Sequence, residues 1–304
     1  MTQQVRWHSD RELLCALPFR YRCYAMYSRF FGSRSSRRVT GGSFLLRAIR
    51  SLSRMVGLST VAPIRGIDGL TVMADFADER VLEVVHEIRG ENPEYRVMQE
   101  LLKEGDTFID VGANFGSFSL LASRLVGSSG IVVAIEPQPR LARMIRESAS
   151  RSSASNVSVH EIAVGAGSEN VALLVPADDS GRAGIFPAFS GAGQREITVV
   201  SVATLDEIAG GLVPLARTFI KIDVEGSEFA VLDGATQIIA ARRPVILIEL
   251  NPWTAKAAGK STGELVELLH QLGYTSFSTT TSFPTLLERS SIPTTGQHNL
   301  VALG

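Results

Sequence analysis

The sequence predicts an α/β protein with a doubly wound, mostly parallel sheet. Short apolar runs, typical of strands buried on both faces, alternate with segments whose apolar residues recur at helical spacing. Acidic or small residues follow several of these runs, where the carboxyl ends of parallel strands would form a ligand-binding rim. The 304 residues suffice for a sizeable core, since α/β folds of about 200–250 residues are common as one unit.

The first 60 residues differ in composition from the rest of the chain. They contain 11 Arg, no Lys and two acidic residues, a net charge of +9, whereas the remainder has 19 basic and 29 acidic residues, a net charge of −10. We therefore predict a basic Arg-rich extension at residues 1–60 and one domain at residues 61–304. The extension could be solvated, could contact an anionic membrane or a partner, or could be a cleaved presequence.

The cysteines and the hydropathy pattern bound the cellular setting. Cys15 and Cys23 both lie near the N-terminus, which suits a reducing compartment without a disulfide framework. No apolar run approaches the roughly 20 residues that a membrane span needs, and no secretory signal is apparent. We expect a cytoplasmic protein without a nucleic-acid partner, and the sequence leaves the oligomeric state open.

The segments before the central strand are the first elements that we predict. Residues 61–74 fit an opening strand or hairpin, with Gly69 as the turn residue, and residues 78–88 fit either a strand or a helix. Residues 94–103 carry an apolar stripe at helical spacing, and Pro93 suits a first helical turn. This helix leads into the central strand at residues 107–111.

The alternation continues beyond the central strand. We predict helices at residues 118–125, 140–149, 204–208, 227–234 and 261–272, and strands at residues 131–135, 157–162, 171–175, 197–202, 219–223 and 245–250, with a terminal pair at 274–278 and 299–303. Residues 178–193 are rich in Gly, Ala, Ser and Asp, which predicts a mobile loop over the site.

A glycine-rich turn follows the central strand. Gly112, Ala113, Asn114 and Gly116 separate the strand, which ends near Asp110, from the next helix. Small residues at such a turn let backbone N–H groups approach a ligand at the positive end of the helix. A turn of this kind alone is weak evidence for a nucleotide site.

The second strand strengthens the prediction because it ends in Glu136-Pro137. An acid at this position can accept hydrogen bonds from the hydroxyls of a ribose. Dinucleotide sites favour three glycines around a pyrophosphate, whereas here Asp110 would repel a pyrophosphate and attract a cation. S-adenosylmethionine carries a sulfonium and an ammonium, so it fits this turn; the alternative is that Asp110 only braces the turn. Ala163 falls on the same rim, after the third strand.

A second constellation runs from Lys221 to Glu228. Asp223 ends a buried strand, and Glu225 and Glu228 follow it around a glycine turn. One carboxylate could stabilise a sulfonium, and another could take the proton of an acceptor hydroxyl. Glu228 could instead only compensate the dipole of the next helix.

The same rim raises the question of a metal. Asp223, Glu249 and Asn251 lie at adjacent strand tips and could hold a divalent cation through oxygen ligands. Carboxylates also cluster at such rims without a metal, and we predict no metal site.

These residues together resemble the FkbM family of S-adenosylmethionine-dependent methyltransferases. The matching motifs are Gly105-Asp106, Asp110 to Gly116, Glu136-Pro137, Thr204-Leu205-Asp206 and Lys221 to Glu228, within residues 91–249. The resemblance implies a seven-stranded Rossmann-like sheet of the class I methyltransferases, with the last strand antiparallel. It also implies methyl transfer to an oxygen, often a hydroxyl of a sugar, glycan or natural product.

The resemblance also assigns roles to residues. Asp110 and the glycine turn would face the methionine part of the cofactor, Glu136 would hold the ribose, and Asp223 and Glu225 would lie near the sulfur and the acceptor. Glu91 loosely matches an acidic residue that the family places before the first helix. The predicted cofactor-binding residues are Glu91, Asp110, Gly112, Ala113, Asn114, Gly116, Glu136, Pro137, Ala163 and Asp223, and the predicted catalytic residues are Asp223, Glu225 and Glu228.

Two alternatives from other functional classes remain at this point. A nicotinamide-dependent oxidoreductase would share the fold, and a catalytically silent module could be anchored to a membrane or a partner by its basic extension. The first would show hydride transfer, and the second would bind vesicles or a partner without binding the cofactor.

Overall fold

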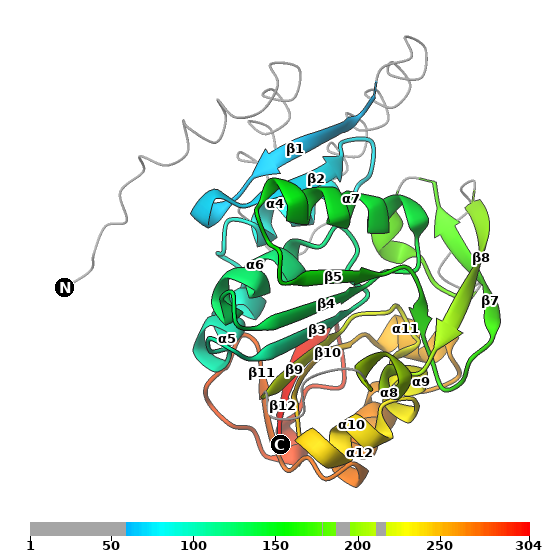
Figure 1. The fold of residues 1–304 in the computed structure, drawn as a ribbon. Coiled ribbons are helices and arrows are strands. Elements are labelled where there is room, and N and C mark those ends of the chain that lie inside the picture. The colour runs from blue at the N-terminus through cyan, green and yellow to red at the C-terminus, as the bar shows by residue number, and fades with distance from the viewer. Residues whose placement is uncertain (1–58, 178, 187–194, 211–216) are drawn as a thin grey trace.

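The computed structural model describes residues 59–177, 179–186, 195–210 and 217–304 (Figure 1). The predicted extension at residues 1–60 therefore lies almost entirely outside the described residues. No helix in the described ranges combines the length and the hydropathy that a bilayer crossing requires.

A seven-stranded sheet forms the centre of the fold, in the order β11-β12-β10-β9-β3-β4-β5. Its strands are β3 (Thr107–Val111), β4 (Ile131–Ile135), β5 (Val157–His160), β9 (Thr218–Ile222), β10 (Val245–Leu250), β11 (Ser276–Thr279) and β12 (His298–Leu303). Neighbouring strands from β10 to β5 are parallel, and β12 is antiparallel to both β10 and β11. The predicted doubly wound sheet with an antiparallel last strand is confirmed.

The strand order reverses at β3. From β3 the chain first adds β4 and β5 on one side, and it later adds β9 and β10 on the other (Figure 1). Ligands of open α/β sheets bind at the carboxyl ends of the strands beside such a reversal. The sheet therefore places its crevice where β3, β4 and β9 end.

Helices cover both faces of this sheet. One layer consists of α4 (Val81–Glu87), α5 (Pro93–Leu101), α6 (Ser117–Val126) and α7 (Pro139–Arg151). The other consists of α8 (Leu205–Ala209), α9 (Glu228–Asp233), α10 (Thr236–Arg242) and α12 (Thr262–Gln271), and α11 (Pro252–Ala257) follows the end of β10. Phe108 and Phe219 belong to the hydrophobic cluster of the first layer, and the adjacent Ile109 and Ile220 belong to that of the second. The alternation of strand side chains thus divides the core into two parts.

The N-terminal part of the described chain forms the predicted hairpin, β1 (Val61–Arg65) and β2 (Thr71–Asp75), joined through the 3-10 turn Ile67–Gly69. It is attached to α7, because Ser148 Oγ accepts a hydrogen bond of 2.8 Å from the Met73 N–H. The segment at residues 78–88, which the sequence left open, contains the helix α4.

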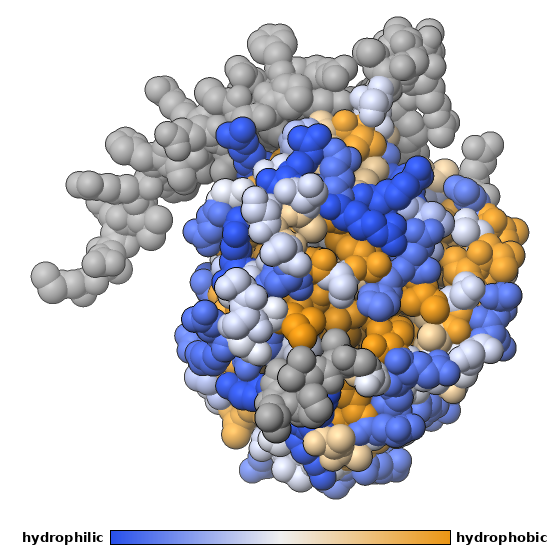
Figure 2. All heavy atoms as spheres, in the orientation of Figure 1, coloured by the Kyte–Doolittle hydropathy of each residue, from blue (hydrophilic) through white to orange (hydrophobic). Residues whose placement is uncertain are grey.

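A small second sheet extends from the third main strand. The predicted strand at residues 157–162 ends earlier, at His160, and the chain then forms β6 (Ala163–Val164), which joins a sheet of order β6-β8-β7. Its other strands are β7 (Asn170–Pro176) and β8 (Arg195–Ala203). Ile197 and Val199 of β8 are exposed, and Figure 2 shows apolar side chains gathered over β7 and β8.

Candidate active site

Gly112 joins the ends of β3 and β9. Its φ is +84°, and a Cβ atom there would lie 2.0 Å from the carbonyl oxygen of Asp223. The Asp223 N–H also donates to the Val111 carbonyl at 3.0 Å. Only glycine allows this close backbone approach, so the turn and the start of the acidic motif form one structural unit.

The glycine turn also meets the end of β4. The Asn114 N–H donates to one oxygen of Glu136 at 2.8 Å, and the Gln138 N–H donates to the other at 2.9 Å. Asn114 itself has a φ of 53°, and Gly116, with a φ of 78°, is the N-cap residue that precedes α6. Burial raises the pKa of Glu136 to about 7, although both N–H donors favour its charged form.

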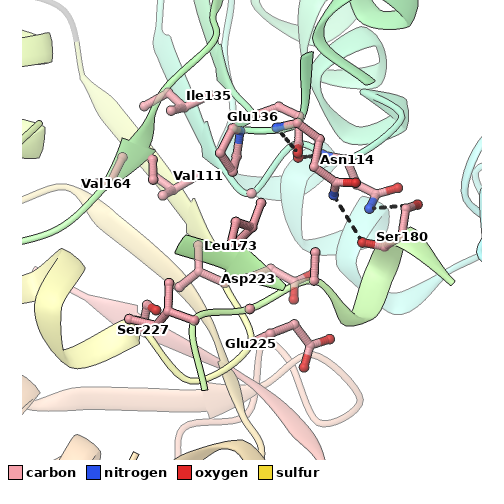
Figure 3. Close-up of a pocket in the computed structure, with 18 of the residues that line it drawn as sticks. Val111, Asn114, Ile135, Glu136, Val164, Leu173, Ser180, Asp223, Glu225 and Ser227 are labelled. Carbon is pink, nitrogen blue, oxygen red and sulfur yellow. Dashed lines mark hydrogen bonds between the residues drawn. The ribbon is translucent and has the colours of Figure 1, made fainter. Parts of the chain in front are cut away.

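One cavity contains most of the predicted residues (Figure 3). Its walls include Gly112, Asn114, Glu136, Pro137, Ala163, Asp223 and Glu225, with the apolar side chains Val111, Ile135, Ile162, Val164 and Leu173. Figure 3 shows Asn114 and Glu136 on one side of Leu173, and Asp223 and Glu225 on the other. The glycine turn and the acid of the second strand therefore open into the same space.

The remaining predicted residues lie outside this wall. Asp110, Ala113 and Gly116 are buried in or next to the glycine turn without lining the cavity. Glu91 is exposed and does not line it either. Glu228 is buried at the start of α9, where its carboxylate accepts the Gly226 N–H at 3.0 Å. The Glu228 carboxylate thus holds the glycine turn at Gly226, which precedes α9.

Residues 179–186, which we call the strap, contribute to the wall of the cavity beside the glycine turn. Ser180 anchors it: its Oγ accepts from the Asn114 side chain at 3.5 Å, its carbonyl accepts from the Gln138 side chain at 3.2 Å, and its N–H donates to Asp78 at 3.0 Å. The described part of the predicted loop thus lies over the site. It contacts Asn114 and Gln138, whose backbone N–H groups both donate to Glu136. Residues 178 and 187–194 lie outside the described ranges.

Asp110 and Lys221 form a buried charged pair behind the turn. Asp110 is completely buried; its Oδ2 accepts from Ser119 at 2.6 Å, and its Oδ1 has no hydrogen-bond partner among the described residues. The Lys221 ammonium lies 3.9 Å from that Oδ1. Burial raises the pKa of Asp110, and Lys221 and Ser119 offset only part of this effect.

Lys221 also holds Asp223. Its Nζ donates to Asp223 Oδ2 at 2.9 Å and lies 5.0 Å from the centre of the Phe118 ring. Burial alone would raise the pKa of Asp223, but the Lys221 ammonium outweighs it and the pKa lies below its usual value. Asp223 therefore stays ionised at neutral pH.

Three carboxylates meet at the end of β9 and β10. One carboxylate oxygen from each of Asp223, Glu225 and Glu249 lies within 4.8 Å of the other two. Burial, followed by the neighbouring Glu249 and Asp223 carboxylates, raises the pKa of Glu225 to about 9. Burial and Asp223 raise that of Glu249 to about 8, and the Asn251 amide donates to Glu249 at 3.4 Å. The cluster favours ligand groups that donate hydrogen bonds or carry positive charge.

A further charged group comes from α4, and the sequence gave no sign of it. Glu87 is buried, accepts from Arg80 at 2.5 Å and accepts from Ser117, the first residue of α6. It thus braces the helix that follows the glycine turn. Glu87 is distant from the motifs in sequence, so only the fold brings it to the site, whereas Gln138 directly follows Glu136-Pro137 and Ser180 lies in the predicted loop.

A comparison with family models identifies the family of the chain. Residues 110–276, more than half of the 304, match the model described as the methyltransferase FkbM domain. The chain belongs to the FkbM methyltransferase domain family. This membership confirms the predicted resemblance and makes S-adenosylmethionine the cofactor of this FkbM chain.

Individual relatives are more distant. The hexuronic acid methyltransferase AglP of Haloferax volcanii is 27% identical over 176 residues, which cover 57% of this chain and 69% of AglP. A solved FkbM methyltransferase from Methylobacillus flagellatus is 18% identical with a TM-score of 0.42, over 73% of this chain and 53% of its own. An O-methyltransferase structure from Thermotoga maritima is 14% identical with a TM-score of 0.39, over 83% of this chain and 80% of its own.

The FkbM chain therefore spans about half the length of the Methylobacillus protein that it matches. At these TM-scores the solved structures carry no functional argument. The family assignment rests on the match over residues 110–276.

Proposed function

We propose that this FkbM methyltransferase methylates a hydroxyl oxygen on a sugar, a glycan or another hydroxylated natural product. The observation that carries the proposal is that one cavity is lined both by Glu136, directly after β4, and by the acids Asp223 and Glu225 after β9. The name of the relative AglP, a hexuronic acid methyltransferase, supports a sugar as the acceptor.

The residues present fit the cofactor. Gly112 leaves no room for a side chain, and its turn lies beside a carboxylate that could accept ribose hydroxyls, Glu136. The unpartnered oxygen of Asp110 is a buried acceptor directly behind this turn. When bound, S-adenosylmethionine supplies a methyl group already activated on a sulfonium.

The two acids at the other wall, Asp223 and Glu225, would have separate roles in methyl transfer. Asp223, kept ionised by Lys221, stabilises positive charge in the cavity. The pKa of Glu225 is raised to about 9, so its ionised form, which becomes more populated toward that pH, would accept the proton that an acceptor hydroxyl loses. The strap would exclude bulk water from this space, and the fixed residues of the cavity would orient the reacting groups.

The test is methyl transfer from S-adenosylmethionine that carries a ¹³C-labelled methyl group, offered with a panel of hydroxylated acceptors. NMR of the product identifies the atom that receives the label, and we expect an O-methyl group. In Glu225→Gln, which keeps the shape of the side chain, we expect kcat to fall roughly 10²–10⁴-fold.

Cofactor binding measured by calorimetry separates this effect from misfolding, because Glu225→Gln should still bind the cofactor. Label found on nitrogen or carbon would overturn the proposed acceptor atom. An unchanged kcat in the variant would remove Glu225 from the proton transfer.

A further inference from the structure

Trp253 is the most exposed of the large hydrophobic side chains that the structure describes, at 77%. It lies in α11, which begins directly after β10, so it sits on the same rim of the sheet as the acidic cluster. A single exposed apolar residue is ordinary on a protein surface. Trp253 differs from such a residue because it follows β10, the strand that carries Glu249 of the acidic cluster.

A short chain of contacts connects Trp253 to the cavity. Its backbone N–H donates to the Asn251 side chain at 3.1 Å, and the amide of that side chain donates to Glu249. Glu249 is within 4.8 Å of Glu225, which lines the cavity. The next residue, Thr254, packs its carbonyl against Gly226, where a Cβ atom would lie 3.1 Å away. The start of α11 therefore borders the acidic wall.

The charges at this wall restrict what can bind between it and Trp253. The cations that face Asp223 are Lys221 and Arg80, and the described contacts pair both with carboxylates: Lys221 with Asp223, and Arg80 with Glu87. A ligand that brought its own carboxylate would add a negative charge beside Asp223, which stays ionised. A ligand rich in hydroxyls would instead donate hydrogen bonds to the carboxyl oxygens of this wall.

We propose, on the basis of the methyltransferase function above, that the acceptor is an uncharged sugar whose ring stacks on the indole of Trp253 while its hydroxyls reach Glu225 and Glu249. A pyranose ring has an apolar face of C–H groups and a polar edge of hydroxyls. The exposed indole provides a flat apolar surface for the first, and the acidic wall provides acceptors for the second. This specificity differs from that in the name of AglP, since a hexuronic acid carries a carboxylate.

The chain offers a direct spectroscopic test because it contains two tryptophans, Trp7 and Trp253. Trp7→Phe leaves Trp253 as the only indole reporter in an otherwise intact protein. Neutral methyl hexopyranosides, titrated in the presence of S-adenosylhomocysteine, should change its fluorescence in a saturable manner. The matching methyl hexuronides should bind more weakly.

Kinetics supply the second readout. Trp253→Ala should raise the KM for a neutral sugar acceptor about three- to tenfold with little change in kcat, whereas Trp253→Tyr should restore most of the affinity. Leu286→Ala, at an exposed residue before the strand bridge to Phe277, is the control and should change neither constant. Cofactor affinity should stay constant in all three variants.

The outcomes separate this inference from the proposed function. Methyl transfer to a non-sugar hydroxyl without any fluorescence response to sugars would overturn the inference and leave O-methylation standing. Hexuronides that bind as tightly as hexopyranosides would also overturn it. An absence of methyl transfer to every acceptor, with intact cofactor binding, would count against the proposed function itself.

Discussion

The substitution Gly112→Ala tests the contact on which the site depends. The added methyl group would lie 2.0 Å from the carbonyl oxygen of Asp223, far inside van der Waals contact, and that oxygen belongs to backbone that cannot rotate away. Residue 112 also has a φ of +84°, which disfavours any side chain. The turn after β3 and the segment that holds Asp223 would have to move apart.

The expected loss of unfolding free energy has two parts, one from the positive φ and one from the steric clash. The left-handed backbone conformation costs a non-glycine residue about 1–2 kcal/mol, of which reduced freedom in the unfolded chain returns roughly 0.4–1 kcal/mol. Forcing apart packed groups adds about 1–3 kcal/mol. Gly69 provides the matched control, because its φ is +71° and a Cβ atom there would meet nothing within 4 Å. We expect a loss of about 1 kcal/mol for Gly69→Ala and about 2–4 kcal/mol for Gly112→Ala.

Urea denaturation gives the free energy of unfolding of both variants, and calorimetry gives their affinity for S-adenosylmethionine. Gly69→Ala should bind the cofactor like the wild type, since its hairpin lies outside the cavity wall. Gly112→Ala should bind at least tenfold more weakly even at temperatures where it is folded. Equal losses of stability in the two variants would show that the close approach of Gly112 to Asp223 has no energetic consequence.

Two further predictions concern buried carboxyl groups. Ser119→Ala removes the only hydrogen bond that the described residues give the carboxylate of Asp110, so it should cost about 2–3 kcal/mol of unfolding free energy. Ser123→Ala on the same helix should cost about 1 kcal/mol, and equal losses in denaturation experiments would contradict this. Burial and the nearby Glu249 raise the pKa of Glu225 to about 9 from an ordinary 4.5, so the wild type should lose stability as the pH rises through this window. Glu225→Gln should match the wild type near pH 4 and exceed it in unfolding free energy at pH 9, and parallel curves from urea titrations would refute the raised pKa.

Local sequence patterns were sufficient to predict most of the main sheet. Strands such as Thr107–Val111 and Ile131–Ile135 are short apolar runs between polar breaks, and such runs report burial on both faces directly. The turn at Gly112 was also predictable from a local pattern. The contact between its backbone and that of Asp223 excludes every residue type other than glycine. Glu136 followed from its position at a strand end.

Long-range contacts decided what the sequence missed. Residues 157–162 were predicted as one strand, but His160 ends β5, and Ala163 pairs with β8 about 40 residues later, which no local pattern records. The segment at residues 78–88 was ambiguous until packing selected the helix α4, whose Glu87 then reaches Ser117.

The sequence by itself determined the identity of the binding edge: strand ends with small or acidic residues, in the order of the FkbM motifs. Tertiary structure alone decided the charge state of that edge. The pKa values of Asp223, Glu225 and Glu249 depend on burial and on one another, and on Lys221 lying 2.9 Å from the first of them. Electrostatic interactions act through space, so residues that are merely acidic in the sequence become an ionised group and raised-pKa acids only when the strands are assembled side by side.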